Sequence, residues 1–403
     1  MGYPWSALDE WQPFKVDALG LVTLLGAQEI DHAIGRLVPS RWLEYMPLLA
    51  GHVIAGDQFR QKKPAFNWYN VTSGIHTTDL AAWFSRWLMA QDFTPTRTIV
   101  WWEVRDQRRR RQGHQWGQRL DDKGIAALMS LCTTGVLIAM GVLLGDWYGF
   151  ANGVALALSI LVRAYIVRAN GAAIDAAVER TLEGRVQDDS GHVKTLMILP
   201  DSTAITVFVS ETLIRTVFVC NPTPHSAMMY GLARAIGWVT FGVHIVALGM
   251  AQLVSQLCTV TLLIVSTVLV CYRVGCDDFL GIWKRTNATL QPSKFYTCWI
   301  GTYLRVTVLE WPTDADFAKD ENGNVRRQDL YAWLNLDAAE EESLAKWNLL
   351  PHARGYSTWV DDFNAKKALI SRDPIDIRRL VMRKREERGV QQPSSGAKVW
   401  SIQ

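Results

Sequence analysis

The polar side chains whose spacing best suits chemistry lie inside the longest apolar stretch of the chain, residues 235–272. Its thirty-eight residues include no Asp, Glu, Lys, Arg or Pro. Polar residues in its second half recur at three-, four- and seven-residue spacing and would share one helical face; they are Gln252, Ser255, Gln256, Thr259 and Ser266. In the first half His244 lies midway, with Thr240 about one helical turn before it.

Two explanations fit this polar face, and the sequence leaves both open. Polar groups in lipid must contact protein or water, because their transfer out of water is costly. The first explanation is hydrogen bonding between helices, the usual behaviour of Ser, Thr and Gln in bundles. The second is a water-lined path for an ion or small solute, built when several copies bring these residues together. Four helices without an internal repeat are few for a monomeric transporter, so a pore would require a homo-oligomer.

Patterns typical of catalysis or metal binding are missing from the sequence. It has no phosphate-binding loop, no GxGxxG after a strand, no GxSxG and no HExxH. Paired acids occur at Asp121-Asp122, Asp277-Asp278 and Asp361-Asp362. None extends to the DDxxD-type spacing with which membrane prenyl-transfer enzymes hold Mg²⁺ and diphosphate. We therefore predict no catalytic residue, no metal and no cofactor, and the balance is against an enzyme.

The apolar stretch is too long for one bilayer crossing. A single straight helix would measure about 57 Å, whereas the hydrocarbon core of a bilayer is about 30 Å thick. Two antiparallel helices of 18–19 residues each would fit, with Gly249–Gln252 as the turn. We predict a membrane hairpin over residues 231–272, and one long tilted helix remains the alternative.

A second pair of apolar helices is predicted over residues 123–168. The first runs from Ile125 to Gly145, and the second returns from Tyr148 to Val167 and continues into water as a stalk. Small residues four apart, which permit close helix contact, occur in both; they are Gly141 and Gly145, then Gly149 and Gly153.

Basic residues flank all four predicted spans on one side. They cluster at 105–119, 163–180, 215–234 and 273–285, and the positive-inside rule places that side in the cytosol, together with both termini. Six arginines of the first two clusters are expected to bind lipid headgroups; they are Arg108, Arg109, Arg110, Arg111, Arg163 and Arg168. This position beside apolar spans favours membrane lipids over nucleic acid as their partner. The six cysteines form no CxxC pair, which suits a reducing cytosolic face.

The predicted fold class is a membrane α-helical protein with four transmembrane helices and cytosolic α+β parts. Three regions are expected in water: a mostly helical N-terminal region (1–122), a stalk with a small β meander (169–230) and an α/β region (273–388), before a disordered tail (389–403). Within the first, a helix from about Thr77 places Leu80, Phe84, Trp87 and Leu88 on one face and Arg86 away from it. The meander comprises three β-rich runs within 193–220.

The runs TAITVFVSETLIRTVFV and RRQDLYAWLNLDAAEEESLAKWNLLPH, with the long apolar stretch between them, resemble uncharacterised multi-pass membrane proteins of filamentous fungi. The resemblance covers roughly residues 120–370 and implies no activity. Our functional hypothesis is a homo-oligomeric channel or transport protein whose pore is lined by the polar face. The alternatives are a membrane-anchored scaffold and, less favoured, a membrane-embedded lipid-modifying enzyme.

Overall fold

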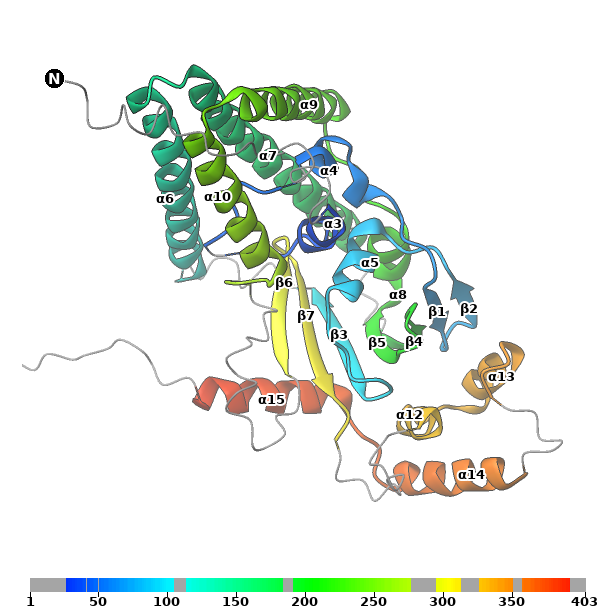
Figure 1. Ribbon diagram of the computed structural model, residues 1–403. Coiled ribbons are helices and arrows are strands. Elements are labelled where there is room, and N and C mark those ends of the chain that lie inside the picture. Colours follow the sequence, from blue (N-terminus) through cyan, green and yellow to red (C-terminus); the bar gives the residue numbers. More distant parts are fainter. Residues whose placement is uncertain are drawn as a thin grey trace, which may run out of the picture.

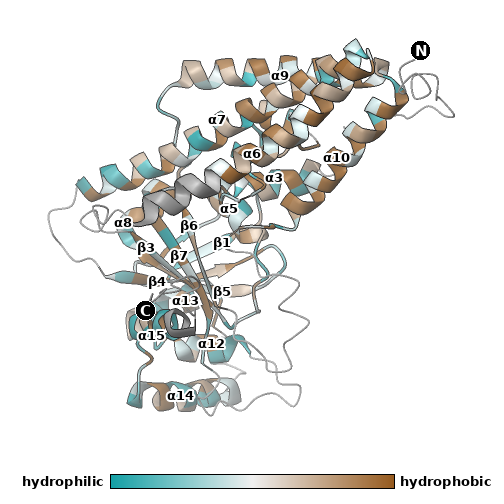
Figure 2. Cartoon of the chain, turned by 90° about the vertical axis from the view of Figure 1, so that its left-hand side faces the viewer, coloured by the Kyte–Doolittle hydropathy of each residue, from teal (hydrophilic) through white to brown (hydrophobic). Residues whose placement is uncertain are grey.

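The protein combines a group of apolar helices with a mixed β-sheet, as Figure 1 shows for the computed structural model. The structure describes residues 27–40, 42–49, 51–104, 114–183, 191–276, 295–312, 326–350 and 357–391, without the side chains of 114–123 and 388–391. Apolar residues concentrate in the helices at one end, and polar residues in the helices at the other (Figure 2).

Four helices are long and apolar enough to cross a membrane, which confirms the predicted number among the described residues. They are α6 (His114–Leu143, apolar from Gly124), α7 (Trp147–Glu183), α9 (Ala227–Met250) and α10 (Leu253–Cys271). The long apolar stretch is broken where Ala251 and Gln252 adopt extended backbone angles. A single continuous helix is therefore excluded. The two legs diverge, and α9 packs chiefly on α7 (Figures 1 and 2).

Part of the N-terminal region lies among these apolar helices. Helices α3 (Ala27–Gly35) and α4 (Gly51–Ala55) contact α10 and α9 respectively. Ile30, Leu49 and Val53 share one hydrophobic cluster with residues of α6, α7, α9 and α10. The bundle is thus completed by a segment of the N-terminal region that was expected in water.

In the part of the chain that the structure describes, seven strands form a single mixed sheet in the order β2-β1-β4-β5-β3-β7-β6. The strands are β1 (Asn67–Asn70), β2 (Ile75–Thr77), β3 (Thr98–Val104), β4 (His192–Ile198), β5 (Ala204–Ser210), β6 (Tyr296–Ile300) and β7 (Leu304–Glu310). Among the described strands, only β3 and β5 pair in parallel. The expected small meander is therefore wrong as an isolated unit, because β4 and β5 are the centre of a sheet drawn from all three regions that were expected in water.

The third run of the expected meander is helical. Residues Glu211–Leu213 form α8, and Ile214–Val219 form a π-helical turn, η3. The reason lies in packing, since Val217 and Phe218 are fully buried. Phe218 meets Phe84 edge-on, with 4.8 Å between ring centroids, and Trp102 at 4.9 Å. Such tertiary contacts outweigh the β preference of the sequence.

Each face of the sheet has its own hydrophobic core, because side chains alternate along a strand. In β3, Val100 and Trp102 face the core formed with α5 (Ala82–Met89) and the end of α7, whereas Ile99 and Trp101 face the other. That second core is covered by α12 (Arg327–Trp333), α13 (Ala338–Lys346), α14 (Ser357–Arg372) and α15 (Ile377–Gln391), at the end away from the apolar helices (Figure 1).

Candidate functional site

Most of the predicted polar residues are buried inside one copy of the chain. Six of the seven are buried, with at most 8% of each residue exposed: Thr240, His244, Ser255, Gln256, Thr259 and Ser266. Gln252, at the turn between α9 and α10, is half-buried. The other helices of the bundle therefore cover the polar face of α10.

A chain of hydrogen bonds crosses the bundle at its centre. His244 Nδ1 lies 2.5 Å from Asn152 Oδ1, and Asn152 Nδ2 donates to Thr259 Oγ1 over 3.0 Å. Because an amide oxygen only accepts, the imidazole carries its proton on Nδ1 in this arrangement. Asn152 is itself 1% exposed. It links α7 to both α9 and α10.

Asn152 was not among the residues predicted from the sequence. It is the only amide side chain in the second predicted span, residues 148–167, and that isolation was the signal available. A lone amide in an apolar helix requires a partner for the same reason as the residues already singled out.

The other predicted polar side chains are satisfied locally or lack a partner. Thr240 Oγ1 donates to the Gly237 carbonyl over 2.9 Å, and Gln256 Nε2 to the Ala251 carbonyl over 3.0 Å. The hydroxyl oxygens of Ser255 and Ser266 are buried and find no hydrogen-bond partner among the described residues. The bonds of Thr240 and Gln256 are thus made to backbone carbonyls close in sequence.

Asp146 joins the two interhelical turns at the far end of the bundle. Its Oδ1 accepts from the Gly149 backbone N–H over 2.9 Å, and its Oδ2 from that of Gln252 over 3.0 Å. The first bond caps α7, and the second reaches the start of α10. A carboxylate at two helix N-termini also meets the positive ends of their dipoles. Asp146, which is 4% exposed, thus ties one helix pair to the other.

The small-residue spacing brings α6 against α7 within one copy. A Cβ added to Gly141 would lie 2.5 Å from the Phe150 backbone nitrogen, and one added to Gly153 would lie 2.8 Å from Ile138 Cγ1. Gly145 has a φ of +67° and forms the turn instead. Close helix approach here is consequently an intramolecular feature.

Two of the arginines expected to bind headgroups contact the segment between α3 and α4. Arg163 is 5% exposed, and its Nη2 donates to the carbonyls of Glu44 (2.7 Å) and Met46 (2.6 Å). Arg168 is exposed and donates to the Tyr45 hydroxyl over 2.7 Å. These bonds seat the segment among the apolar helices, where Leu49 N–H also donates to Thr267 Oγ1 over 3.1 Å.

The remaining predicted residues give no reactive centre in the described part of the chain. No group of three His, Cys, Asp or Glu residues able to hold a metal occurs among the described residues. Asp362 pairs with Lys366 at 3.1 Å. Arg108–Arg111 and Asp277-Asp278 lie outside the described residues.

A buried ion pair joins the apolar helices to the sheet domain. Arg86 of α5, expected to point away from the core, is 0% exposed and donates through Nε to Asp31 Oδ1 over 2.9 Å. Three backbone carbonyls accept its other hydrogen bonds: Gln61 (2.7 Å), Ala82 (3.1 Å) and Gln58 (2.5 Å). Burial lowers the pKa of Arg86, and its hydrogen bond to Asp31 acts in the opposite direction. Lys63 pairs with the second carboxylate oxygen at 2.8 Å.

The part of α7 that lies beyond the predicted span is fixed to the edge of the sheet. Asp175 of α7 accepts from the backbone N–H of Thr302, at 2.7 Å to Oδ1, and from that of Tyr303 at 3.3 Å. Gly301, with a φ of +64°, passes so close that an added Cβ would lie 2.4 Å from Asp175 Oδ1. One helix therefore runs from the bundle to the β6–β7 turn.

No family model, curated protein or solved structure matches this chain. The likeness to fungal membrane proteins stays a prediction from the sequence. Functional inference therefore rests on the geometry described above.

Proposed function

We propose that this protein is an integral membrane protein with both termini in the cytosol, whose four apolar helices anchor the sheet domain to the membrane as a scaffold for other proteins. The observation that carries the proposal is the closed polar cluster, in which Asn152 joins His244 to Thr259. A domain held in this way would present its surface at a fixed place beside the bilayer.

Exposed apolar side chains on the helix bundle support insertion in a membrane. Soluble monomers rarely expose large contiguous apolar patches. Large exposed apolar residues occur on all four helices and include Leu131, Val136, Leu161, Val239, Val246 and Val265. Lipid would cover these side chains at no cost in hydrophobic free energy.

The polar cluster favours an anchor over the channel suggested by the sequence. A pore between copies would need Gln256 and Thr259 to face outward toward a neighbouring copy, but both are buried in one copy. The hydrogen bonds of His244 and Asn152 are likewise made inside that copy. Hydrogen bonding between helices, the first of the two explanations for the polar face, therefore accounts for the contacts of His244 and Thr259 without water.

Rigid attachment of the sheet supports the scaffold role. Ile174, Ala177 and Val178 of α7 belong to the same hydrophobic core as the sheet strands. Asp175 on the same helix holds the β6–β7 turn. Motion of the sheet relative to the bundle would have to break both the core and these bonds.

Native cysteines provide a test of insertion. Cys132 on α6 and Cys258 on α10 are exposed on the bundle surface, and Cys220 is exposed just before α9. In sealed vesicles with the cytosolic face outward, a membrane-impermeant maleimide should label a variant that retains only Cys220. Variants that retain only Cys132 or Cys258 should react after detergent is added. Labelling of Cys132 or Cys258 in intact vesicles would contradict insertion.

A second experiment separates scaffold from channel. Purified protein reconstituted in vesicles should give no ion or small-solute flux above protein-free vesicles. Photo-crosslinkers at Leu369 of α14 and Met382 of α15, both exposed, should give discrete protein adducts in native membranes. Matched crosslinkers at Val239 and Val246 should give lipid adducts. Specific flux, or protein adducts from the lipid-facing positions alone, would favour the channel.

A further inference from the structure

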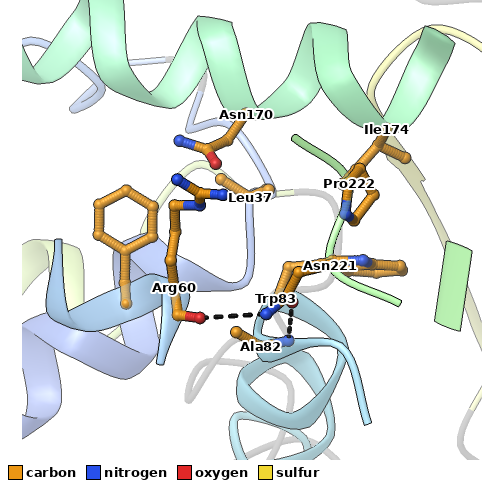
Figure 3. A pocket seen from close by; sticks show the side chains of 9 residues that line it. Leu37, Arg60, Ala82, Trp83, Asn170, Ile174, Asn221 and Pro222 are labelled. Atoms are coloured by element: carbon orange, nitrogen blue, oxygen red, sulfur yellow. Dashed lines mark hydrogen bonds between the residues drawn. The ribbon is translucent and has the colours of Figure 1, made fainter. Parts of the chain in front are cut away.

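A small pocket lies at the junction between the apolar helices and the sheet domain (Figure 3). It is lined by η1 (Gln58–Arg60), α5, α7, Leu37 and the chain that precedes α9. The Arg60 side chain reaches toward Asn170 of α7, and Pro222 and Ile174 lie across from it (Figure 3). The pocket is partly open to solvent and much smaller than pockets for drug-sized ligands, which start near ~300 Å³, so it can receive only one small group at its mouth.

The Arg60 guanidinium is a cation that keeps N–H donors available for a ligand. Among the described residues, Asp57 accepts the only hydrogen bond of the Arg60 guanidinium, at 3.3 Å. A guanidinium carries five N–H donors, and this side chain remains 27% exposed. Its carbon lies 5.3 Å from the centre of the Tyr230 ring, which keeps the side chain extended along the pocket.

The local charge balance favours an anion. Asp57 is shared by two arginines, since Arg234 also lies 3.9 Å from its Oδ2. The Tyr230 hydroxyl donates to the other carboxylate oxygen of Asp57, Oδ1, over 2.5 Å. Two guanidiniums therefore face one carboxylate whose acceptors are largely used. A phosphate would supply the missing negative charge through charge-assisted hydrogen bonds.

The depth of the pocket suits a lipid headgroup if the four helices span the membrane as proposed, and the inference rests on that function. Along α7, Asn170 lies about 4–5 Å beyond Val167, the predicted end of the span, and Ile174 about 10 Å beyond it. The polar layer on each side of a bilayer is about 5–8 Å thick. The pocket thus begins inside the layer that contains lipid phosphates.

We propose that this pocket binds the phosphate group of an anionic phospholipid from the cytosolic leaflet, with Arg60 as its cationic partner. Leu37, Ile174 and Pro222 give the pocket an apolar wall that a lipid ester group can contact. Asn221 shapes the pocket floor, because its Oδ1 accepts from the Ala82 N–H at 2.6 Å and its Nδ2 donates to the Arg60 carbonyl at 3.2 Å. A bound phosphate would stabilise the chain segments that meet there.

Lipid-dependent stabilisation of the full-length protein tests the site. The probes are phosphatidic acid, phosphatidylcholine, glycerol 3-phosphate and inorganic phosphate, added to protein in neutral detergent, with thermal stability and native mass as readouts. Phosphatidic acid should stabilise the protein and give a one-lipid adduct. Arg60→Gln should weaken this binding about tenfold or more, because it removes a charge-assisted contact. Arg60→Lys should retain most of it.

Lys62→Gln is the matched control, since Lys62 is a nearby exposed cation paired with Asp79 at 3.2 Å. It should bind phosphatidic acid as the unmodified protein does. Equal binding by all variants, or equal stabilisation by phosphatidylcholine, would overturn the proposal. Stabilisation by glycerol 3-phosphate or inorganic phosphate as strong as by the lipid would identify a soluble phosphate as the ligand and refute the lipid source. Failure of the membrane anchor itself would appear separately, as labelling of Cys132 in intact vesicles.

Discussion

Replacement of Arg86 by Met should unfold the junction between the apolar helices and the sheet domain. Met keeps much of the side-chain volume but removes the charge and all four donated hydrogen bonds. Asp31, 4% exposed, would then keep only Lys63 as a partner among the described residues, and the Lys63 side chain is 31% exposed. Breaking a buried ion pair from one side costs about 3–5 kcal/mol. Because Lys63 still neutralises the carboxylate, we expect the lower end, about 3 kcal/mol.

The assay is denaturant unfolding of the detergent-solubilised protein, followed by tryptophan fluorescence and by limited proteolysis. Lys62→Met provides the control, because its pair with Asp79 is solvent-exposed and such pairs contribute about 0–1 kcal/mol. Asp31→Asn should destabilise in the same direction as Arg86→Met. Equal, small losses for Arg86→Met and Lys62→Met would refute the view that this buried pair holds the two parts together.

Three further predictions follow from single contacts. Burial lowers the pKa of His32 below its ordinary value of 6.5. The contribution of neutral His32 to the free energy of unfolding is therefore complete above pH 6.5 and is lost as the pH falls below that value. His32→Gln should flatten this loss of unfolding free energy between pH 7 and pH 5, and an unchanged slope would contradict the reasoning. Asp175→Ala removes the acceptor of two backbone N–H groups and should accelerate amide hydrogen exchange in residues 296–310, while unchanged exchange would mean that the β6–β7 turn does not depend on α7. Gly141→Leu should lower the free energy of unfolding by about 1–3 kcal/mol, because the larger side chain disturbs the α6–α7 contact. Gly135→Leu is the control: no atom lies within 4 Å of its added Cβ, so the free energy of unfolding should change by less than ~0.5 kcal/mol. Similar effects of the two variants would show that α6 and α7 do not pack closely at Gly141.

The number of apolar helices could be predicted from the sequence because length and hydropathy are local properties. The break in the long stretch also followed from a local limit, since thirty-eight residues exceed one crossing. Strand-like composition within residues 193–220 identified β4 and β5 correctly. It failed at Ile214–Val219, where contacts with residues more than a hundred positions away decide the conformation.

The sheet order and the polar contacts could not be predicted in the same way, because each depends on residues far apart in the chain. Thr98 of β3 pairs with Glu310 of β7, and Arg163 reaches the carbonyl of Met46. The helical period placed Thr259 on a polar face correctly but could not say whether a neighbouring copy or Asn152 would meet it. Only the tertiary structure distinguishes those partners.

The central claim is that the polar cluster is closed within one copy of the chain, and a double-mutant cycle between Asn152 and Thr259 tests it most directly. The single variants Asn152→Leu and Thr259→Val and the double variant would be unfolded in a detergent in which the protein is monomeric. Hydrogen bonds between membrane helices contribute about 0.6 kcal/mol on average and up to ~1.7 kcal/mol. We predict a coupling free energy in that range for the monomer. Additive effects on monomer stability, together with loss of a solute flux in vesicles, would contradict the account and restore the pore.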